Sequence, residues 1–194
     1  MKILIATHND KKTDEMKKIL DSDNLQLVTL KDLGDEDDVI EDGQSFFENA
    51  LIKASYFAKK HQITTISDDS GLEIYALNHR PGIFSARYSG KGDDENNLKV
   101  LKELEGVSNR GARFVSVIVV CHPGGTHQAY EGVIEGEILD HFRGTKGFGY
   151  DPIFYIPDVK QTFAEMDASL KNQISHRAIA LFKLKEHLHE VINH

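Results

Sequence analysis

The stretch from Arg113 to His122 most constrains the fold, because it is apolar along almost its whole length. It contains Phe114, Val115, Val117, Ile118, Val119 and Val120. A strand with one face in water alternates apolar and polar residues, whereas this run predicts a central strand that is apolar on both faces. Residues 128–139 do alternate, and we expect them to pair antiparallel with the central strand across Pro123-Gly124-Gly125.

The remaining elements follow from hydrophobic spacing. We expect further strands at 2–6, 25–30, 63–66 and 72–77, and helices at 10–20, 44–60, 93–104 and 178–192. Helical spacing predicts an apolar face in the second helix made of Phe47, Ala50, Leu51, Ala54, Phe57 and Ala58, and in the third helix of Leu98, Leu101 and Leu104. The 194 residues carry no repeats or linkers, and we expect one domain over residues 1–194.

Charge and cysteine content exclude several function classes. The net charge of −8 argues against general nucleic-acid binding, so a polyanionic substrate would have to meet a local cluster of Lys and Arg. Cys121 is the only cysteine, which excludes an intrachain disulfide and a cysteine-based zinc cluster. The apolar run at residues 2–6 is too short for a signal peptide or a membrane span, so we expect a cytoplasmic protein without membrane contact.

The segment Thr7-His8-Asn9-Asp10-Lys11-Lys12 joins a predicted strand to a predicted helix. Such a turn presents backbone N–H groups and the positive end of a helix dipole, which suits a phosphate, and Lys12 adds a cation. The alternative is a simple helix cap by Asn9 or Asp10, with Lys12 in solvent.

Two adjacent carboxylates follow the 63–66 strand, in Ser67-Asp68-Asp69-Ser70-Gly71. Because side chains alternate along a strand, Asp68 and Asp69 face opposite ways unless the chain turns, and Gly71 permits a turn, which we expect here. The two acids are candidates for chemistry. The alternative is a loop in which Asp and Ser bond their own backbone.

Two later segments suit the binding of a base. In the glycine-rich segment 144–152, Phe148 or Tyr150 could stack on a base, or one of these rings could belong to the core. Near the last helix, Ser175 is placed to cap, which puts His176 and Arg177 in the first turn. The helix dipole disfavours cations there, and an anionic or polar ligand would offset that cost.

Taken together, these segments resemble one family, the inosine/xanthosine triphosphate pyrophosphatases. The matching motifs span nearly the whole chain in the family's order: Thr7-x-Asn9-x-x-Lys12, Phe47-Glu48-Asn49-Ala50, Asp68-Asp69-Ser70-Gly71-Leu72, Pro81-Gly82-x-x-Ser85-Ala86-Arg87-Tyr88, Gly147-Phe148-Gly149-Tyr150-Asp151-Pro152 and Ser175-His176-Arg177. The family often has a proline in the acidic loop before the glutamate matched by Glu41, whereas Asp37 and Asp38 occupy that region here.

The resemblance implies a fold, an activity and partners. The implied fold is an elongated α/β fold with a mixed β-sheet flanked by helices, and two lobes around a central active-site cleft. The implied activity is Mg²⁺-dependent hydrolysis of non-standard purine nucleoside triphosphates (ITP, dITP and XTP) to the monophosphate and pyrophosphate, which cleanses the nucleotide pool. A homodimer is also implied.

The resemblance further implies roles for individual residues. Glu41 and Asp69 match metal carboxylates, and Asp69 also matches the proton acceptor; a weak base suffices where a metal acidifies the attacking water. Asp68 is then either a partner of these ligands or a further ligand. Substrate contacts are implied for Thr7, His8, Asn9, Asp10, Lys11, Lys12, Lys53, Ser70, Phe148, Gly149, Tyr150, Asp151, Lys171, His176 and Arg177. For Lys53, a surface lysine without contact to the substrate is the alternative.

Selection of the base is expected to depend on donors. Hypoxanthine and xanthine carry an oxygen at the six position, where adenine carries an amino group. Arg177 can only donate and His176 can donate from either nitrogen, so we expect these two to favour the oxygen.

Two other function classes fit the same carboxylates. One is a metal-dependent phosphohydrolase that cuts a monoester or diester, which would not release pyrophosphate in one step. The other is a nucleotide-binding module without catalysis, which would have no need for both Glu41 and Asp69 beside a phosphate loop.

Overall fold

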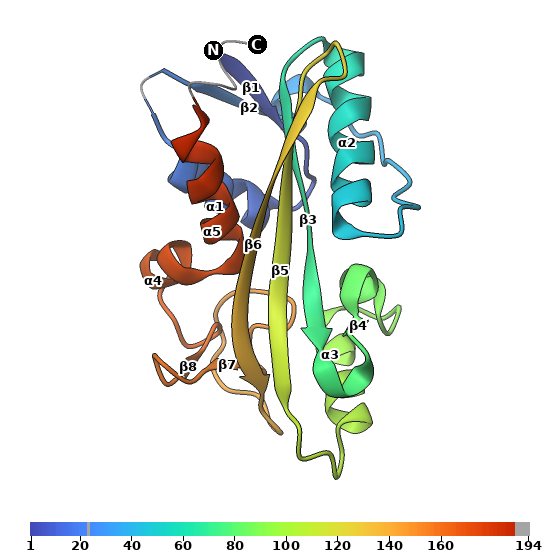
Figure 1. Ribbon diagram of the computed structural model, residues 1–194, viewed down its shortest axis with the longest axis vertical. Helices are drawn as coiled ribbons and strands as arrows, with labels where there is room; N and C mark the ends of the chain where they lie inside the picture. The colour runs from blue at the N-terminus through green and yellow to red at the C-terminus, as the bar shows by residue number, and fades with distance from the viewer. Residues whose placement is uncertain (23, 189–194) are drawn as a thin grey trace. The chain divides into compact units, whose positions relative to one another are not determined.

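The computed structural model describes residues 1–22 and 24–188, which form a mixed α/β fold (Figure 1). The strand order in the sheet is β2-β1-β3-β5-β6-β7-β8, and β4 pairs with β3. The contacts divide the chain into two compact units. Unit 1 comprises residues 1–69, 116–132 and the described residues from 177 onward, and unit 2 comprises residues 70–115 and 133–176.

Unit 1 is built around β1 (Lys2–Ile5), which pairs in parallel with β2 (Gln26–Thr29) and with β3 (Thr65–Ile74). Alternate residues of this segment bury on opposite sides. Ile3 and Ile5 pack with α1 (Asp10–Leu20) and α5 (His176–Glu186). Leu4 and Ala6 pack instead with Phe57 of α2 (Phe46–His61). Residues 3–6 are therefore apolar without interruption, because helices cover both faces of this segment.

Unit 2 has one core, to which helix and strands contribute together. Leu104 directly follows α3 (Asp93–Glu103), and it packs with Phe114 of β5 and Phe154 of β7. The rings of Phe114 and Phe154 meet edge to face, with 4.6 Å between their centroids. The elements not yet given bounds are the strands β4 (Arg80–Pro81), β5 (Gly111–Cys121), β6 (His127–Ile138), β7 (Phe154–Ile156) and β8 (Gln161–Thr162), the helix α4 (Ala168–Ile174), and the 3-10 turns Lys31–Leu33, Tyr75–Leu77 and Gly82–Arg87.

Most of the predicted elements are confirmed, including the central strand and the hairpin turn, across which His122 N–H donates to Thr126 O at 2.9 Å. The predicted turn at Asp68-Asp69 is wrong, because β3 continues through both residues to Ile74. The predicted inward placement of Phe47 and Leu98 is also wrong, since these side chains are 37% and 50% exposed. The end of the last helix at Ile192 lies outside the described residues.

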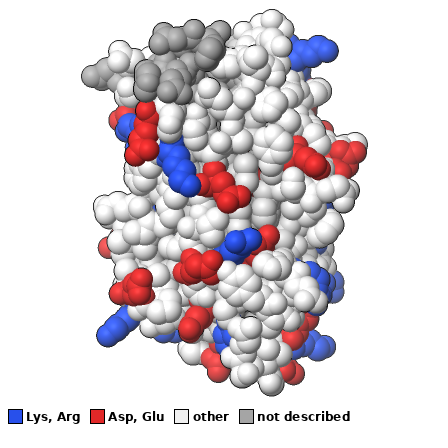
Figure 2. Space-filling model, viewed as in Figure 1, with Lys and Arg blue, Asp and Glu red and all other residues white. Residues whose placement is uncertain are grey.

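None of the described helices is long and apolar enough to cross a membrane. On the face drawn in Figure 2, acidic and basic side chains of the described residues are interspersed rather than gathered by sign. The drawn face of the described residues therefore carries no basic patch of the kind that general nucleic-acid binding needs.

Candidate active site

In unit 1, the segment Thr7–Lys12 joins β1 to α1, as the spacing predicts. Asn9 is the helix N-cap, and its side-chain oxygen accepts hydrogen bonds from the backbone N–H groups of Lys11 at 3.0 Å and Lys12 at 3.2 Å. Thr7 Oγ1 accepts from the Asn9 N–H at 3.2 Å. The cap is thus confirmed, and the phosphate role, which stays a prediction, rests mainly on the side chain of Lys12. The exposed His8 ring contacts the carbonyl oxygen of Asp37 at 2.9 Å.

Lys12 belongs to a buried ion cluster rather than to solvent. Its Nζ lies 3.1 Å from Asp68 Oδ2, and its side chain is only 17% exposed. Arg177 Nε donates to the same Asp68 oxygen at 3.2 Å, while another guanidinium nitrogen donates to Glu15 of α1. Arg177 is 2% exposed. The cluster therefore ties α1, β3 and the start of α5 together through one carboxylate.

Burial and charge act against each other in this cluster. Burial raises the pKa of Asp68, but the cations of Lys12 and Arg177 outweigh it and hold that pKa well below its usual range. Burial lowers the pKa of Lys12, and the nearby cations of Arg177 and Lys53 lower it further. The negative charge of Asp68 acts in the opposite direction. Asp68 is therefore ionised, and Lys12 is a cation that an additional anion would stabilise.

Asp69 follows Asp68 on β3, and strand alternation directs its side chain to the other face. Its Oδ2 accepts a hydrogen bond from Asn49 Nδ2 at 3.1 Å. Burial raises the pKa of Asp69 to about 6, Glu41 adds to the rise, and Lys12, Asn49 and Lys53 lower the pKa only in part. A carboxylate with a pKa this close to neutrality is typical of a functional site.

The loop before α2 brings Glu41 into this electrostatic environment. Glu41 Oε1 accepts from Lys53 Nζ at 2.8 Å, so Lys53 is not a solvated surface lysine. The N–H of Gly43 donates to Asn49 Oδ1 at 2.9 Å. A Cβ at Gly43 would lie 2.7 Å from Glu48 Cβ and 2.8 Å from Asn49 Oδ1, so only glycine fits there. Asn49 thereby connects the loop that carries Glu41 to Asp69.

Asn49 and Glu15 were not among the predicted site residues, although both hold predicted ones in place. For Asn49 a signal exists in the sequence. It stands between Phe46 and Ala50 on the buried face of α2, and a polar side chain in such a position needs a partner. For Glu15 no such signal exists, because its partner Arg177 lies far along the chain.

The carboxylates of unit 1 suit a hard divalent cation. Glu41 and Asp69 offer oxygen ligands of the kind that such a cation prefers. Asp68 Oδ1 is buried without a hydrogen-bond partner among the described residues, so it is a further oxygen acceptor. No group of three or more His, Cys, Asp or Glu within the described part of the chain could hold a metal ion alone. Mg²⁺ commonly uses one or two carboxylates together with water and substrate phosphates, and the residues fit that pattern.

In unit 2, the segment Gly147–Asp151 forms a tight turn. Asp151 Oδ2 accepts from the Phe148 N–H at 3.0 Å and from Lys171 Nζ at 2.7 Å. Lys171 Nζ also lies 4.7 Å from the centroid of the Phe148 ring. A Cβ at Gly147 would lie 1.9 Å from Asp151 Oδ2, and Gly147 has a φ of +78°, so this position requires glycine.

Of the two aromatic candidates in this turn, Tyr150 belongs to the core. It is buried, and its hydroxyl donates to the Ser85 carbonyl oxygen at 2.7 Å. Phe148 is half-buried and stays the candidate for stacking on a base. His176 also lies in unit 2, where its ring stacks on Phe114 with 4.6 Å between centroids. Ser70 lies on β3, half-buried, and its predicted substrate contact stays a prediction.

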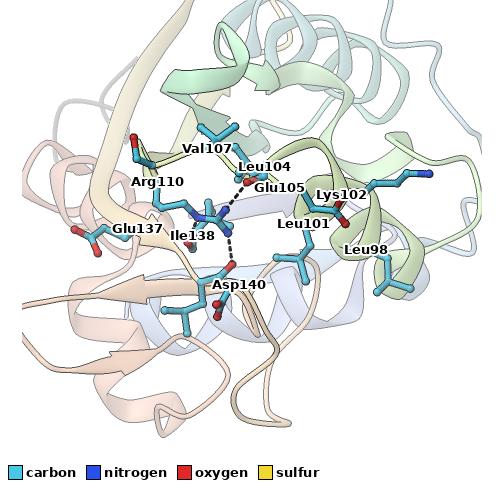
Figure 3. A pocket seen from close by; sticks show the side chains of 13 residues that line it. Leu98, Leu101, Lys102, Leu104, Glu105, Val107, Arg110, Glu137, Ile138 and Asp140 are labelled. Atoms are coloured by element: carbon cyan, nitrogen blue, oxygen red, sulfur yellow. Dashed lines mark hydrogen bonds between the residues drawn. The ribbon is translucent and has the colours of Figure 1, made fainter.

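Two hollows in the surface lie apart from these charged residues. One, of about 570 Å³ in unit 1, is lined partly by Thr7 and His8 but not by Lys12 or Asp69. The other, of about 800 Å³ in unit 2, lies between α3 and the end of β6 (Figure 3). Its central Arg110 donates to the carbonyl oxygens of Leu104 at 2.9 Å, Ile138 at 2.8 Å and Leu139 at 2.7 Å. The Arg110 guanidinium thus binds backbone carbonyl oxygens, and this hollow is not the candidate site.

Comparison with known proteins gives consistent matches over the full length. Residues 3–187 match the model of the Ham1 family. A protein of Desulfotalea psychrophila named dITP/XTP pyrophosphatase is 45% identical over 98% of this chain and 86% of its own length. The solved Ham1 protein of Coxiella burnetii is 42% identical, covering 98% of this chain and 99% of its own, with a TM-score of 0.91. The Staphylococcus aureus Ham1 protein is 40% identical, covering 98% and 100%, with a TM-score of 0.89.

Proposed function

The chain belongs to the Ham1 family, and we propose from that membership and from the site that it hydrolyses ITP, dITP and XTP to the monophosphate and pyrophosphate with Mg²⁺. The relatives named dITP/XTP pyrophosphatase support the substrate class. The protein is accordingly an enzyme, a nucleoside triphosphate pyrophosphatase.

The observation that carries the proposal is the placement of Asp69, a carboxylate that accepts a hydrogen bond from Asn49 at 3.1 Å and lies in the field of Lys12, Lys53 and a second carboxylate, Glu41. Burial raises the pKa of Asp69 to about 6, and such a value suits a proton acceptor, because at neutral pH the carboxylate is mostly ionised and yet holds a proton better than an ordinary aspartate.

Each residue of unit 1 has a definable task in that reaction. Asp69 takes the proton of the attacking water, and Asn49 keeps the carboxylate oriented through its 3.1 Å hydrogen bond. Lys12 and Lys53 neutralise phosphate charge, which is the main catalytic requirement of phosphoryl transfer. Asp68 holds Lys12 at the end of the predicted phosphate loop.

Magnesium fits this arrangement through Glu41 and Asp69. When bound, it would neutralise phosphate charge and acidify the attacking water. Lys53 holds the carboxylate of Glu41 through an ion pair at 2.8 Å.

The residues of unit 2 would bind the nucleoside. Phe148 offers a stacking face, which adds affinity for any purine without selecting among them. Lys171 and Asp151 fix that ring through a 2.7 Å ion pair and the Phe148 N–H. His176, and from unit 1 Arg177, remain the predicted donors toward the six-position oxygen, and Arg177 in addition holds Asp68 and Glu15.

The finer aspects of the proposal follow from the family resemblance. We propose that the enzyme works as a homodimer in the cytoplasm, where it removes damaged purine nucleotides before they reach polymerases. Sedimentation of the purified chain tests the dimer.

The test of the activity is release of pyrophosphate from a panel of nucleotides, with and without Mg²⁺. We expect pyrophosphate from ITP, dITP and XTP, much less from ATP, and none when the metal is chelated. Release of orthophosphate alone would instead indicate a phosphatase, and no release from any nucleotide would indicate a binding module.

A further inference from the structure

The first turn of α3 holds the turn that carries Phe148. The Gly149 N–H donates to Asp93 Oδ2 at 2.8 Å, and the Gly149 carbonyl oxygen accepts from Asn97 Nδ2 at 2.8 Å. Both polar backbone atoms of Gly149 are therefore bonded to one helical turn. We call Asp93 and Asn97 the α3 clamp.

The α3 clamp is itself well ordered by its surroundings. Asn97 is 1% exposed, and its Nδ2 also donates to the Asp93 carbonyl oxygen at 2.8 Å, which ties the two clamp residues together. The neighbouring Asn96 bonds the carbonyl oxygens of Ser85 at 3.3 Å and Ala86 at 3.2 Å, so this end of α3 is anchored on both sides. Gly149 is thus bonded to a helix end that is itself held in place.

Gly149 needs such a support. Its φ of +59° lies in the left-handed region, and a Cβ there would meet nothing within 4 Å, so the residue faces open space on that side. The hydrogen bonds to Asp93 and Asn97 hold both polar backbone atoms of Gly149. The position of Gly149 in turn sets the direction in which the chain leaves Phe148.

We propose that Asp93 and Asn97 are positioning residues for nucleoside binding, because they fix the Gly149 peptide and through it the stacking ring of Phe148. This inference rests on the proposed function for its substrate. Neither residue needs to touch the nucleotide. The Asp151–Lys171 pair supports the Phe148 side of the turn, and the α3 clamp supports the Gly149 side.

The decisive comparison uses three variants of the full chain. Asp93→Ala removes the acceptor, Asp93→Asn keeps an acceptor oxygen but loses the charge, and Asp94→Ala removes a carboxylate from the same exposed turn without touching Gly149. Because Asp93 is exposed, all three are expected to fold. Pyrophosphate release from ITP with Mg²⁺ then gives KM and kcat separately.

We expect Asp93→Ala to raise KM about five- to tenfold with kcat within about twofold, and Asp93→Asn to restore KM to within about twofold. Asp94→Ala should leave both constants unchanged. Equal effects of Asp93→Ala and Asp94→Ala, failure of Asp93→Asn to restore KM, or a fall in kcat alone would each overturn the proposal.

A second readout does not depend on turnover. The chain has no tryptophan, so Phe148→Trp introduces a single indole at the tip of the turn. Without nucleotide, its fluorescence anisotropy should fall when Asp93→Ala is added and stay unchanged when Asp94→Ala is added. Equal anisotropy in both backgrounds overturns the clamp. If the wild-type chain releases no pyrophosphate from ITP, the proposed function fails, whereas this readout still decides the clamp.

Discussion

Unit 1 and unit 2 bury polar groups in different ways. Unit 1 buries charge, with Lys12 and Arg177 sharing the carboxylate of Asp68. Among the described residues of unit 2, the only ion pair that is buried to a comparable degree joins Lys171 and Asp151. Aromatic rings and backbone hydrogen bonds surround this pair. Burying a charge costs desolvation free energy, which interactions with an ionic ligand offset. Aromatic rings suit stacking on a flat base. The comparison favours the proposal that phosphate chemistry belongs to unit 1 and stacking of the base to unit 2.

The largest expected effect tests the chemical role of unit 1. Asp69→Asn keeps the shape and one oxygen but loses the charge and the proton acceptor, so kcat should fall by about a hundredfold or more with KM little changed. Asp38→Asn, in the exposed acidic loop, is the matched control. Steady-state pyrophosphate release decides the matter, and a variant that retains a tenth of the wild-type kcat would remove Asp69 from this role.

Arg177→Ala tests whether one residue serves both tasks. The change removes the buried guanidinium that Asp68 and Glu15 share and leaves Asp68 paired with Lys12, and we expect a loss of about 3–5 kcal/mol in the free energy of unfolding. Urea denaturation measures it. We also expect kcat/KM for ITP and XTP to fall more than for ATP, as predicted from the donor chemistry. A uniform loss over all three nucleotides would confine Arg177 to the ion cluster.

Lys12→Ala should separate phosphate binding from base binding. Its Nζ lies at the predicted phosphate loop, so affinity for ITP should fall about tenfold or more while affinity for IMP changes much less. Calorimetric titration with both ligands gives the two constants. Lys18→Ala, at the exposed end of α1, is the control. Equal weakening of both ligands would place Lys12 at the nucleoside.

Phe148→Ala should produce the opposite pattern in unit 2. Loss of a stacked ring costs about 1–3 kcal/mol, so IMP and ITP should both bind about tenfold more weakly, with kcat nearly unchanged. Phe142→Ala, which removes an exposed ring of unit 2, serves as the control. If Phe148→Ala lowers kcat and leaves KM unchanged, the division of tasks between the units is wrong.

The smallest effect concerns the loop that leads to Glu41. Burial raises the pKa of Asp35, but hydrogen bonds from Lys60, the Asp37 N–H and His61 outweigh it and lower that pKa to about 2. Because the pKa is lower in the folded state, the stabilisation is complete above about pH 4 and is lost as the pH falls toward 2. Asp35→Asn should therefore cost about 1 kcal/mol at pH 7, after allowance for screening by solvent, and almost nothing near pH 2. A cost that is the same at both pH values would show that the ion pairs are not its source.

Local patterns in the sequence predicted much of this structure. The helix at Asp10–Leu20 and its cap at Asn9 depend on neighbours within one turn, and both are confirmed. The predicted turn at Asp68-Asp69 was wrong because β3 pairs along its length with other strands, with β1 up to Ile66, with β4 at Glu73 and Ile74, and with β5, and local propensity could not reveal this pairing. The strands β7 and β8 and the helix α4 were missed because they span only 3, 2 and 7 residues, which is too short for a periodic pattern.

The candidate site was predictable to the extent that motifs identify residues. Asp69, Lys12 and Lys53 could be named from the sequence, but their relation to Asn49 and Glu41 depends on how α2 lies beside β3. Arg177 shows the limit most clearly. Its residue type suggested a free donor, whereas long-range pairing with Asp68 and Glu15 gives it two carboxylate partners.

The uninterrupted course of β3 through Asp68 and Asp69 has a consequence for protein engineering. Because side chains alternate along a strand, deleting or inserting one residue between Thr65 and Asp68 would exchange the faces to which the two acids point. Asp68, which pairs with Lys12, and Asp69, which accepts a hydrogen bond from Asn49, would then point to each other's present faces. The amino-acid composition alone would not reveal this change. Changes of chain length are therefore best made in the connections, such as residues 122–126, where the alternation of the strands is not disturbed.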